Sequence, residues 1–301
     1  ENLERSDKME STINKYSKQL IILNSIFIFC WLVLSIFPFL WTFWGSFKVK
    51  ADFFSRADWW YAVSGVNTLI ETGGRTTLEA YINSWIEGEF WRAARNTVIV
   101  TFSVVTISLF LGTLGAYALS RSTYKYAFWI LIAALVFRAM PHITLVSGYL
   151  FPFFQLKIWG ILPTTIIVLV AINQPFTLWL LYSFFKTVPK ELDESALIDG
   201  ASYFQTFRHI IMPVMWPGVI TAGLFSLMLA YNDFTVTALL LNQENYTMVP
   251  KINAYLGTVE HGGNYMWAVA SVVSATAPLF MIVMFFQRQL ISGLTTGAVK
   301  G

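Results

Sequence analysis

The sequence predicts an all-α membrane protein with six transmembrane helices. Of its 301 residues, 56% are hydrophobic and only 12% are charged, whereas an ordinary soluble domain carries about 25% charged residues. No globular core of this length could bury so many apolar side chains, so lipid must solvate part of the chain. A polar segment at 189–213 interrupts the apolar pattern and is the second main feature of the sequence.

Six apolar runs are each long enough to cross a bilayer as a helix, which takes about 20 residues. The runs are 20–47, 96–119, 126–151, 161–185, 218–241 and 266–287. Because they are continuously apolar and do not alternate with a period of two, they predict helices and not a β-barrel. The first run is too long for the apolar part of a signal peptide, so we expect it to remain in the protein.

Lysine and arginine residues predict which side of the membrane each loop faces. If the N-terminus is cytoplasmic, the cytoplasmic side holds most basic residues of the short loops, among them Arg121, Lys125 and Arg288. The two short outer loops hold only Lys157 and Lys251. We therefore expect both termini and the polar segment to face the cytoplasm.

The expected domain organisation follows from these runs. It comprises a cytoplasmic N-terminal segment at 1–19, the first transmembrane helix at 20–47, an extracytoplasmic loop at 48–95, a core transmembrane domain at 96–291 and a cytoplasmic tail at 292–301. The loop contains four tryptophans among mixed charges, and it predicts either a small helical cap or an aromatic belt at the membrane interface. The tryptophans are Trp59, Trp60, Trp85 and Trp91.

The polar segment predicts two short helices joined at a glycine. Pro189 fits the first position of a helix, and the acidic residues that follow suit the positive end of the helix dipole. Gly200 can adopt a positive φ and end this helix in a sharp turn. Ser202 and Gln205 have the spacing of a capping box for a second helix, which we expect Pro213 to end. The apolar face of this second helix would consist of Phe204, Phe207, Ile210 and Ile211. Judged by its residues alone, the segment fits docking onto another protein and a solvated loop on the membrane equally well.

The same segment resembles the EAA motif of permease subunits in bacterial ABC importers. That motif reads E-A-A-x-x-D-G-A, followed by an apolar stretch that ends in I-x-x-P. The matching residues are Glu194, Ser195, Ala196, Asp199, Gly200, Ala201, Phe207, Ile210 and Pro213. Ser195 departs from the usual alanine but stays small. Further runs, such as RAMP at 138–141, YNDF at 231–234 and GLTTGAVKG at 293–301, resemble the six-span subunit of the carbohydrate-importing, maltose-transporter type.

The resemblance implies the transmembrane domain of a type I ABC importer for sugars or oligosaccharides, in the bacterial inner membrane. In that family two homologous permease subunits form the pathway as a heterodimer. Two cytoplasmic ATPase subunits bind ATP and Mg, and an extracytoplasmic binding protein delivers the sugar. The polar segment would then be a coupling-helix elbow that contacts the ATPase through the matching residues given above. Gly293, Thr296 and Gly297 of the tail would also reach toward the ATPase subunits.

No nucleotide-binding, catalytic or metal site is predicted in this chain itself. The sequence contains no G-x-x-x-x-G-K-[ST] loop, which would cradle a phosphate. His142, His209 and His261 are scattered and lack the spacing of metal ligands. We therefore expect a permease subunit without enzyme activity, without a cofactor of its own and without a nucleic-acid partner.

Polar and aromatic residues within the apolar runs are candidates for a substrate pathway, because sugar rings stack on aromatic faces and sugar hydroxyls need hydrogen-bond partners. These candidates are Asn173, Gln174, Asn232, Asp233, Tyr149 and Trp179. Hydrogen bonding between helices explains the polar members equally well.

Arg138 precedes Pro141 in the third run, and for it we expect a structural or gating role before a role in sugar contact. The main alternative to an ATP-driven importer is an ion- or proton-coupled secondary transporter, in which Asp233 and Arg138 would carry the coupling charge. A third alternative is a membrane scaffold or receptor without transport.

Overall fold

The computed structural model describes the chain except for residue 1 and residues 49–52, 54–77, 125, 258–263 and 299–301. Within the described residues all named elements are helices, and an isolated bridge joins Gly160 to Leu241. The predicted all-α fold is therefore confirmed. The chain divides into two compact units, Glu1–Ala80 and Tyr81–Gly301.

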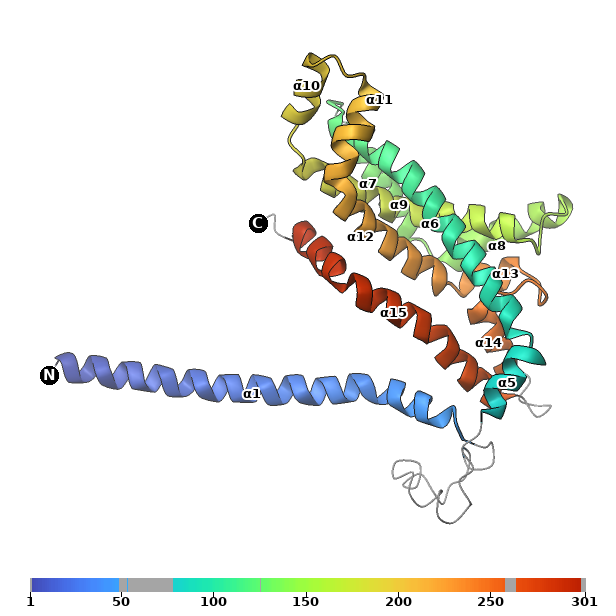
Figure 1. Ribbon diagram of the computed structural model, residues 1–301, viewed down its shortest axis with the longest axis horizontal. Coiled ribbons are helices and arrows are strands. Elements are labelled where there is room, and N and C mark those ends of the chain that lie inside the picture. Colours follow the sequence, from blue (N-terminus) through green and yellow to red (C-terminus); the bar gives the residue numbers. More distant parts are fainter. Residues whose placement is uncertain (1, 49–52, 54–77, 125, 258–263, 299–301) are drawn as a thin grey trace, which may run out of the picture. The chain divides into compact units, whose positions relative to one another are not determined.

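The first unit is built on one long helix, α1, which runs from Asn2 to Gly45 (Figure 1). Its part from Leu20 to Gly45 has 26 residues and is apolar enough to cross a membrane. At 1.5 Å per residue this part is about 39 Å long, which exceeds the roughly 30 Å of a hydrocarbon core. Helix α1 thus covers the first predicted span up to Gly45, and it also includes most of the N-terminal segment before that span.

Most of the predicted outer loop at 48–95 lies outside the described residues, including Trp59 and Trp60. Its last part is helical, because it contains α5 (Glu79–Ile86) and the first turns of α6. The indole N–H of Trp85 donates to the hydroxyl of Ser274 at 3.2 Å, and the Trp85 ring meets Phe90 edge-on. This end of the loop is therefore packed helix.

The remaining helices belong to the second unit (Figure 1). They are α6 (Phe90–Arg121), α7 (Tyr126–Ala139), α8 (His142–Gln155), α9 (Leu162–Thr187), α10 (Glu191–Ile198), α11 (Tyr203–Gln205), η2 (Thr206–Ile211), α12 (Met212–Tyr231), α13 (Thr235–Leu240), α14 (Met248–Gly257) and α15 (Tyr265–Ala298). Helices α6, α9 and α12 pack against one another and form the centre of this unit.

Small residues let α6 approach α9 closely. Every fourth residue of α6 along one stripe is buried, namely Val100, Val104, Ser108, Gly112, Ala116 and Ser120. At Gly112 the approach is tight, since an added Cβ would lie 3.1 Å from Leu181 Cδ1 and 3.2 Å from Thr177 Cγ2. Such stripes are typical of helix pairs in membranes, where close van der Waals packing takes the place of the hydrophobic effect between helices.

The third predicted span, 126–151, is broken in the structure. Helices α7 and α8 meet at an angle of 85° around Met140 and Pro141. Proline cannot donate a backbone hydrogen bond and its ring clashes with the preceding turn, so the helix restarts after Pro141. Each half has 14 residues, about 21 Å, so neither crosses a hydrocarbon core alone.

The fifth predicted span, 218–241, is also interrupted. Helix α12 ends at Tyr231, and α13 begins at Thr235. The Asp233 carboxylate accepts the backbone N–H groups of Val236 and Thr237, both at 3.0 Å. An aspartate that bonds these free N–H groups starts a new helix in place of continuing the old one.

Contacts at the two ends of α9 show that α7 and α8 together make one pass. Arg121 at the end of α6 forms an ion pair with Asp193, just after α9. At the opposite end Gly160, just before α9, accepts a hydrogen bond from the side chain of Asn245, and Asn96 near the start of α6 donates to Tyr246. The chain between α6 and α9 therefore returns from one end of the unit to the other. With α7 and α8 counted as one, the described helices provide six passes.

Candidate functional site

The first helix of the elbow ends in a left-handed glycine, as the sequence predicts. Gly200 has a φ of +86°. The backbone N–H of Ala201 donates to the carbonyl of Ala196 at 3.0 Å, and that of Gly200 donates to Leu197 at 3.1 Å. This pair of bonds is a Schellman motif, which satisfies the last carbonyls of a helix and turns the chain sharply. Helix α10 begins two residues after Pro189, so the proline precedes the helix and does not occupy its first position.

The second helix of the elbow starts with the predicted capping box. The backbone N–H of Gln205 donates to Ser202 Oγ at 3.3 Å, and the backbone N–H of Ser202 donates to Gln205 Oε1 at 2.8 Å. The prediction that Pro213 ends this helix is wrong. Residues Tyr203–Tyr231 form one continuous helical segment that includes Pro213 in the first turn of α12.

A turn of π-helix explains how the helix passes Pro213. Within Thr206–Ile211 the bonds run to the fifth residue back, and the N–H of Met212 donates to the carbonyl of Phe207. The wider turn comes directly before the proline, which then stands at the start of α12, where a missing N–H is tolerated. The elbow is therefore joined to α12 without a break.

The tip of the elbow exposes large apolar side chains on both sides of Gly200. Ile198 is 86% exposed, Tyr203 75% and Phe204 64%. Glu194, Ser195 and Asp199 are exposed beside them. Ala196 is only 3% exposed, because it packs inside the elbow and does not lie on its outer face.

The apolar face predicted for the second helix is only partly right. Ile211 is fully buried, and Phe207 and Ile210 are partly buried against the core of α9 and α12. Phe204, which the helical spacing assigns to the same face, instead points outward. Of the matched residues, Phe207 anchors the elbow to the core, and Pro213 is exposed on α12.

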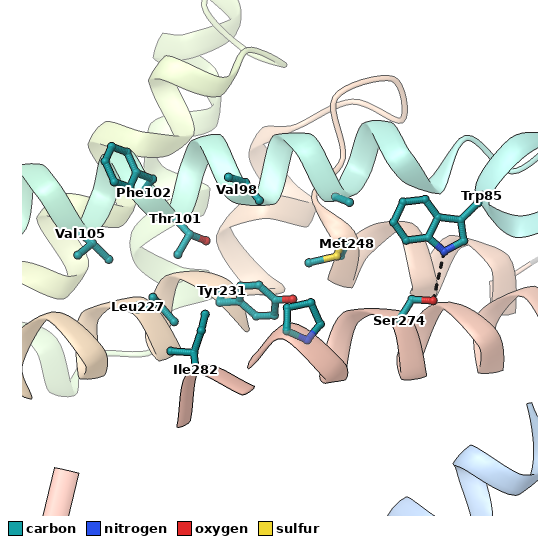
Figure 2. A pocket seen from close by; sticks show the side chains of 12 residues that line it. Trp85, Val98, Thr101, Phe102, Val105, Leu227, Tyr231, Met248, Ser274 and Ile282 are labelled. Atoms are coloured by element: carbon teal, nitrogen blue, oxygen red, sulfur yellow. Dashed lines mark hydrogen bonds between the residues drawn. The ribbon is translucent and has the colours of Figure 1, made fainter. Parts of the chain in front are cut away.

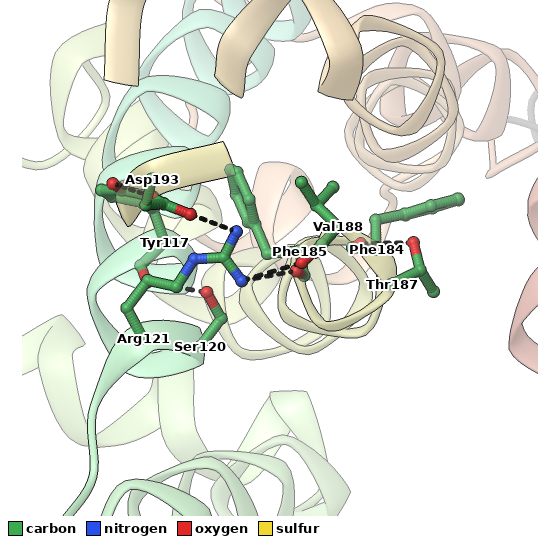
Figure 3. A network of polar contacts seen from close by, with 8 residues as sticks. All are labelled: Tyr117, Ser120, Arg121, Phe184, Phe185, Thr187, Val188 and Asp193. Carbon is green, nitrogen blue, oxygen red and sulfur yellow. Dashed lines mark hydrogen bonds and ion pairs between the residues drawn. The ribbon is translucent and has the colours of Figure 1, made fainter. Parts of the chain in front are cut away.

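A partly buried polar network holds the base of the elbow (Figure 3). Arg121 Nη2 lies 2.8 Å from Asp193 Oδ2, and both side chains are about 15% exposed. The Tyr117 hydroxyl donates to Asp193 Oδ1 at 2.5 Å. Arg121 Nη1 also donates to the carbonyls of Phe185 and Val188, at 3.2 and 3.1 Å. The network therefore connects the end of α6, the end of α9 and the first turn of α10.

Sequence reasoning did not single out Tyr117 or Arg121 as site residues, and it treated Asp193 only as an acid favoured by the helix dipole. The sequence shows the charges of Arg121 and Asp193, but it does not show that the two residues pair, because they stand on different helices far apart in the sequence. A basic residue at the last turn of one span and an acid after another were the only signals available.

Among the described residues, each polar candidate for the pathway makes its own separate set of contacts. Asn173 is 3% exposed within α9. Gln174 donates a long bond of 3.4 Å to the carbonyl of Ser108 on α6. Asn232 is exposed and bonds its own helix at the carbonyl of Met228. Asp233 caps α13, so of these four only Gln174 is seen to bridge two long helices.

The aromatic and cationic candidates contact other aromatic rings and the backbone of α9. Tyr149 is 49% exposed and stacks on Phe153, and Trp179 is 39% exposed against Phe176. Arg138 donates to the carbonyl of Ile172 at 3.3 Å, and its guanidinium lies 5.1 Å from the centre of the Phe176 ring. These contacts of Arg138 tie α7 to α9 near Pro175.

An apolar hollow of about 310 Å³ lies between α6, α12 and α15 (Figure 2). Its polar atoms are few and mostly engaged, since Tyr231 donates to the carbonyl of Ala275 at 2.6 Å and Ser274 bonds Trp85. Thr101 Oγ1 lacks a hydrogen-bond partner among the described residues. A sugar presents many hydroxyl groups that need partners, so this wall does not suit a carbohydrate.

Helix α15 continues through most of the predicted tail and ends at Ala298. Gly293, Thr296 and Gly297 therefore belong to the last turns of a helix, and residues 299–301 lie outside the described part.

The architecture defines a class of protein: a multi-pass helical membrane protein with an exposed helical elbow between its fourth and fifth passes. The family model for the inner membrane component of binding-protein-dependent transport systems matches residues 108–296. This match runs from within α6 through α9, the elbow and α12 to the last turn of α15, and the chain belongs to that family. It is therefore a permease component of an importer, and the family supports this interpretation and not the ion-coupled alternative.

Two relatives and one solved structure agree with the assignment. The trehalose/maltose transport system permease protein MalG of Thermococcus litoralis is 32% identical over 89% of this chain and 93% of its own length. The diacetylchitobiose uptake system permease protein NgcG of Streptomyces coelicolor is 28% identical over 90% of this chain and 86% of its length. The fold is similar to a chain in the crystal structure of a bacterial ABC transporter involved in the import of the acidic polysaccharide alginate. That chain has a TM-score of 0.68, with 18% identity over 89% of this chain and 95% of the other.

Proposed function

We propose that this chain is a permease subunit of an ATP-driven carbohydrate importer. It forms half of the translocation pathway, and ATP hydrolysis in a separate ATPase subunit drives its conformational change. The observation that carries the proposal is the elbow, two capped helices around Gly200 with an exposed apolar tip. The names of the related permeases, which refer to trehalose, maltose and diacetylchitobiose, support sugars as the substrate class.

The elbow has the composition of a docking surface. Ile198, Tyr203 and Phe204 expose apolar area that water solvates poorly, and a clustered apolar patch with a polar rim is typical of an interaction site. Glu194 and Asp199 beside the patch favour a partner groove with basic groups at its edge. A cytoplasmic ATPase subunit with an apolar groove and a basic rim fits these features, and Gly200 allows the turn that presents them.

The assembly that this role requires has several further parts. A second, homologous permease subunit would complete the pathway, and two ATPase subunits would bind ATP and Mg. An extracytoplasmic sugar-binding protein would deliver the substrate. The elbow and both termini would face the cytoplasm of a bacterial cell, with the end of α15 directed toward the ATPase subunits.

The exposed candidates are the residues of this chain that would contact the sugar. Asn232 offers an exposed amide, and Tyr149 and Trp179 offer part of a ring face. Asn173 and Gln174 are better suited to bonding between helices, because they lie in the packed region of α9. Arg138 fits a structural role between α7 and α9.

Transport into proteoliposomes tests the proposal. The chain would be reconstituted with its partner permease, ATPase subunits and binding protein, and uptake of radiolabelled maltose, trehalose and diacetylchitobiose would be measured. We expect uptake of at least one sugar that requires enclosed ATP and persists when an ionophore collapses the proton gradient. An ATPase subunit unable to hydrolyse ATP is the control and should abolish uptake. Uptake that needs the gradient and not ATP would refute the proposal.

A further inference from the structure

Tyr117, near the end of α6, contacts both helices of the elbow. Its hydroxyl donates to Asp193 in the first turn of α10, where the chain enters the elbow. Its ring lies 5.0 Å, centre to centre, from that of Phe207 in η2, where the chain leaves the elbow. One side chain of α6 thus holds the entering and the leaving segment together (Figure 3 shows the Asp193 side of this contact).

Arg121, one turn further along α6, joins the same carboxylate to the end of α9. One guanidinium nitrogen pairs with Asp193, and another donates to the carbonyls of Phe185 and Val188. The last carbonyls of a helix carry partial negative charge, so a cation stabilises them as well as the carboxylate. Arginine suits this position because its planar fork presents several donors in a fixed geometry.

The burial of these groups makes the link stiff. Arg121 and Asp193 are each about 15% exposed, so solvent competes little for their hydrogen bonds. The Tyr117 ring is also held by Phe185 at 5.7 Å. Displacing the elbow without moving α6 would break several bonds at once, whereas the tip at Gly200 has no side-chain contact within 4 Å of where a Cβ would stand.

We infer that Tyr117 and Arg121 are positioning residues that fasten the coupling elbow to α6, so that movement of the elbow enters the membrane helices through α6 as well as through α12. This inference rests on the proposed coupling role of the elbow. Helix α6 has 32 residues, about 48 Å, and its first turns pack with Met248 and Tyr255 of α14 at the opposite end of the unit. A fixed joint at Arg121 would therefore pass the movement to that opposite end.

The test measures sugar uptake per ATP hydrolysed in the reconstituted complex for Arg121→Gln, Asp193→Asn and the double variant. We expect each single change to lower this ratio about tenfold, in the usual range of coupling between sites. The double variant should be no worse than the poorer single variant, because both changes remove the same link. Arg121→Lys, which keeps the charge but not the forked geometry, should restore part of the ratio.

Two further variants keep the test decisive. Tyr117→Phe retains the ring contacts and loses only the hydroxyl bond, so it should assemble normally and still lower the ratio. Glu191→Gln is the matched control, because it removes an exposed charge from the same turn of α10, and its ratio should equal that of the wild type. Wild-type ratios in Tyr117→Phe and Arg121→Gln would overturn the inference. Failure of the proposed function would look different, since the wild-type complex itself would then show no ATP-dependent uptake.

Discussion

At Gly200 one backbone angle decides whether the elbow can form. Its φ of +86° lies in the left-handed region, and no other atom comes within 4 Å of where a Cβ would stand. A side chain would therefore fit at position 200, and the backbone conformation alone decides which substitutions are tolerated. Asparagine tolerates positive φ, whereas a β-branched residue there is strained by about 1–3 kcal/mol.

We therefore expect Gly200→Asn to retain the ATPase subunit on purification and Gly200→Val to lose it or to hydrolyse ATP without transport. Co-purification and uptake per ATP are the measurements. Both variants add a side chain of similar size, so steric bulk at the interface is controlled. Equal behaviour of the two variants, whether both active or both inactive, would show that the left-handed turn is not what the interface needs.

At the scale of the elements, small residues set how closely the central helices pack. Gly218 of α12 faces α9 so closely that an added Cβ would lie 2.8 Å from Phe184 Cγ. An aromatic ring anchored in a packed interface cannot move aside easily, so added volume there forces a shift of backbone or ring. Gly148 of α8 has no atom within 4 Å of the corresponding position.

Gly218→Ala should destabilise the protein by about 1–3 kcal/mol, through overpacking against Phe184. Gly148→Ala is the matched control and should leave stability unchanged or raise it by up to about 1 kcal/mol, since alanine is the better helix former. Thermal unfolding of the purified permease in detergent measures both. A melting temperature of Gly218→Ala at or above that of Gly148→Ala would contradict the packing argument.

At the scale of the whole molecule, the bent pair α7–α8 determines the topology. Arg121 and Asp193 are in contact, so the end of α6 and the elbow lie on the same side of the membrane.

Single cysteines at Tyr124, Tyr203 and Glu244 in a Cys30→Ser background test this arrangement. With an impermeant maleimide on intact cells, we expect labelling at Glu244 alone, and labelling at Tyr124 and Tyr203 only after permeabilisation. If α7 and α8 instead re-entered without crossing, Tyr124 and Tyr203 would label from opposite sides.

Local features of the elbow were predictable because neighbouring residues decide them. The left-handed Gly200 and the Ser202–Gln205 capping box need only a few bonds within one turn, and both are present. The continuation of the helix through Pro213 was not predictable, because it depends on a π-turn. The hydrogen bonds of this turn have a less favourable geometry, and the packing of Phe207 and Ile211 against the core compensates for it. The exposed Phe204 was missed for the same reason, since helical spacing assumes regular turns.

The sequence by itself determined that lipid surrounds this chain, where most of its helices run and how its elbow turns, because hydropathy, proline and capping act over short distances. Only the tertiary structure decided which helix ends meet. The pairing of Arg121 with Asp193, the sharing of Tyr117 between both helices of the elbow, and the joining of α7 and α8 into one pass depend on contacts between helices distant in the sequence. Such contacts arise from the packing of whole helices, and no local pattern of residues predicts them.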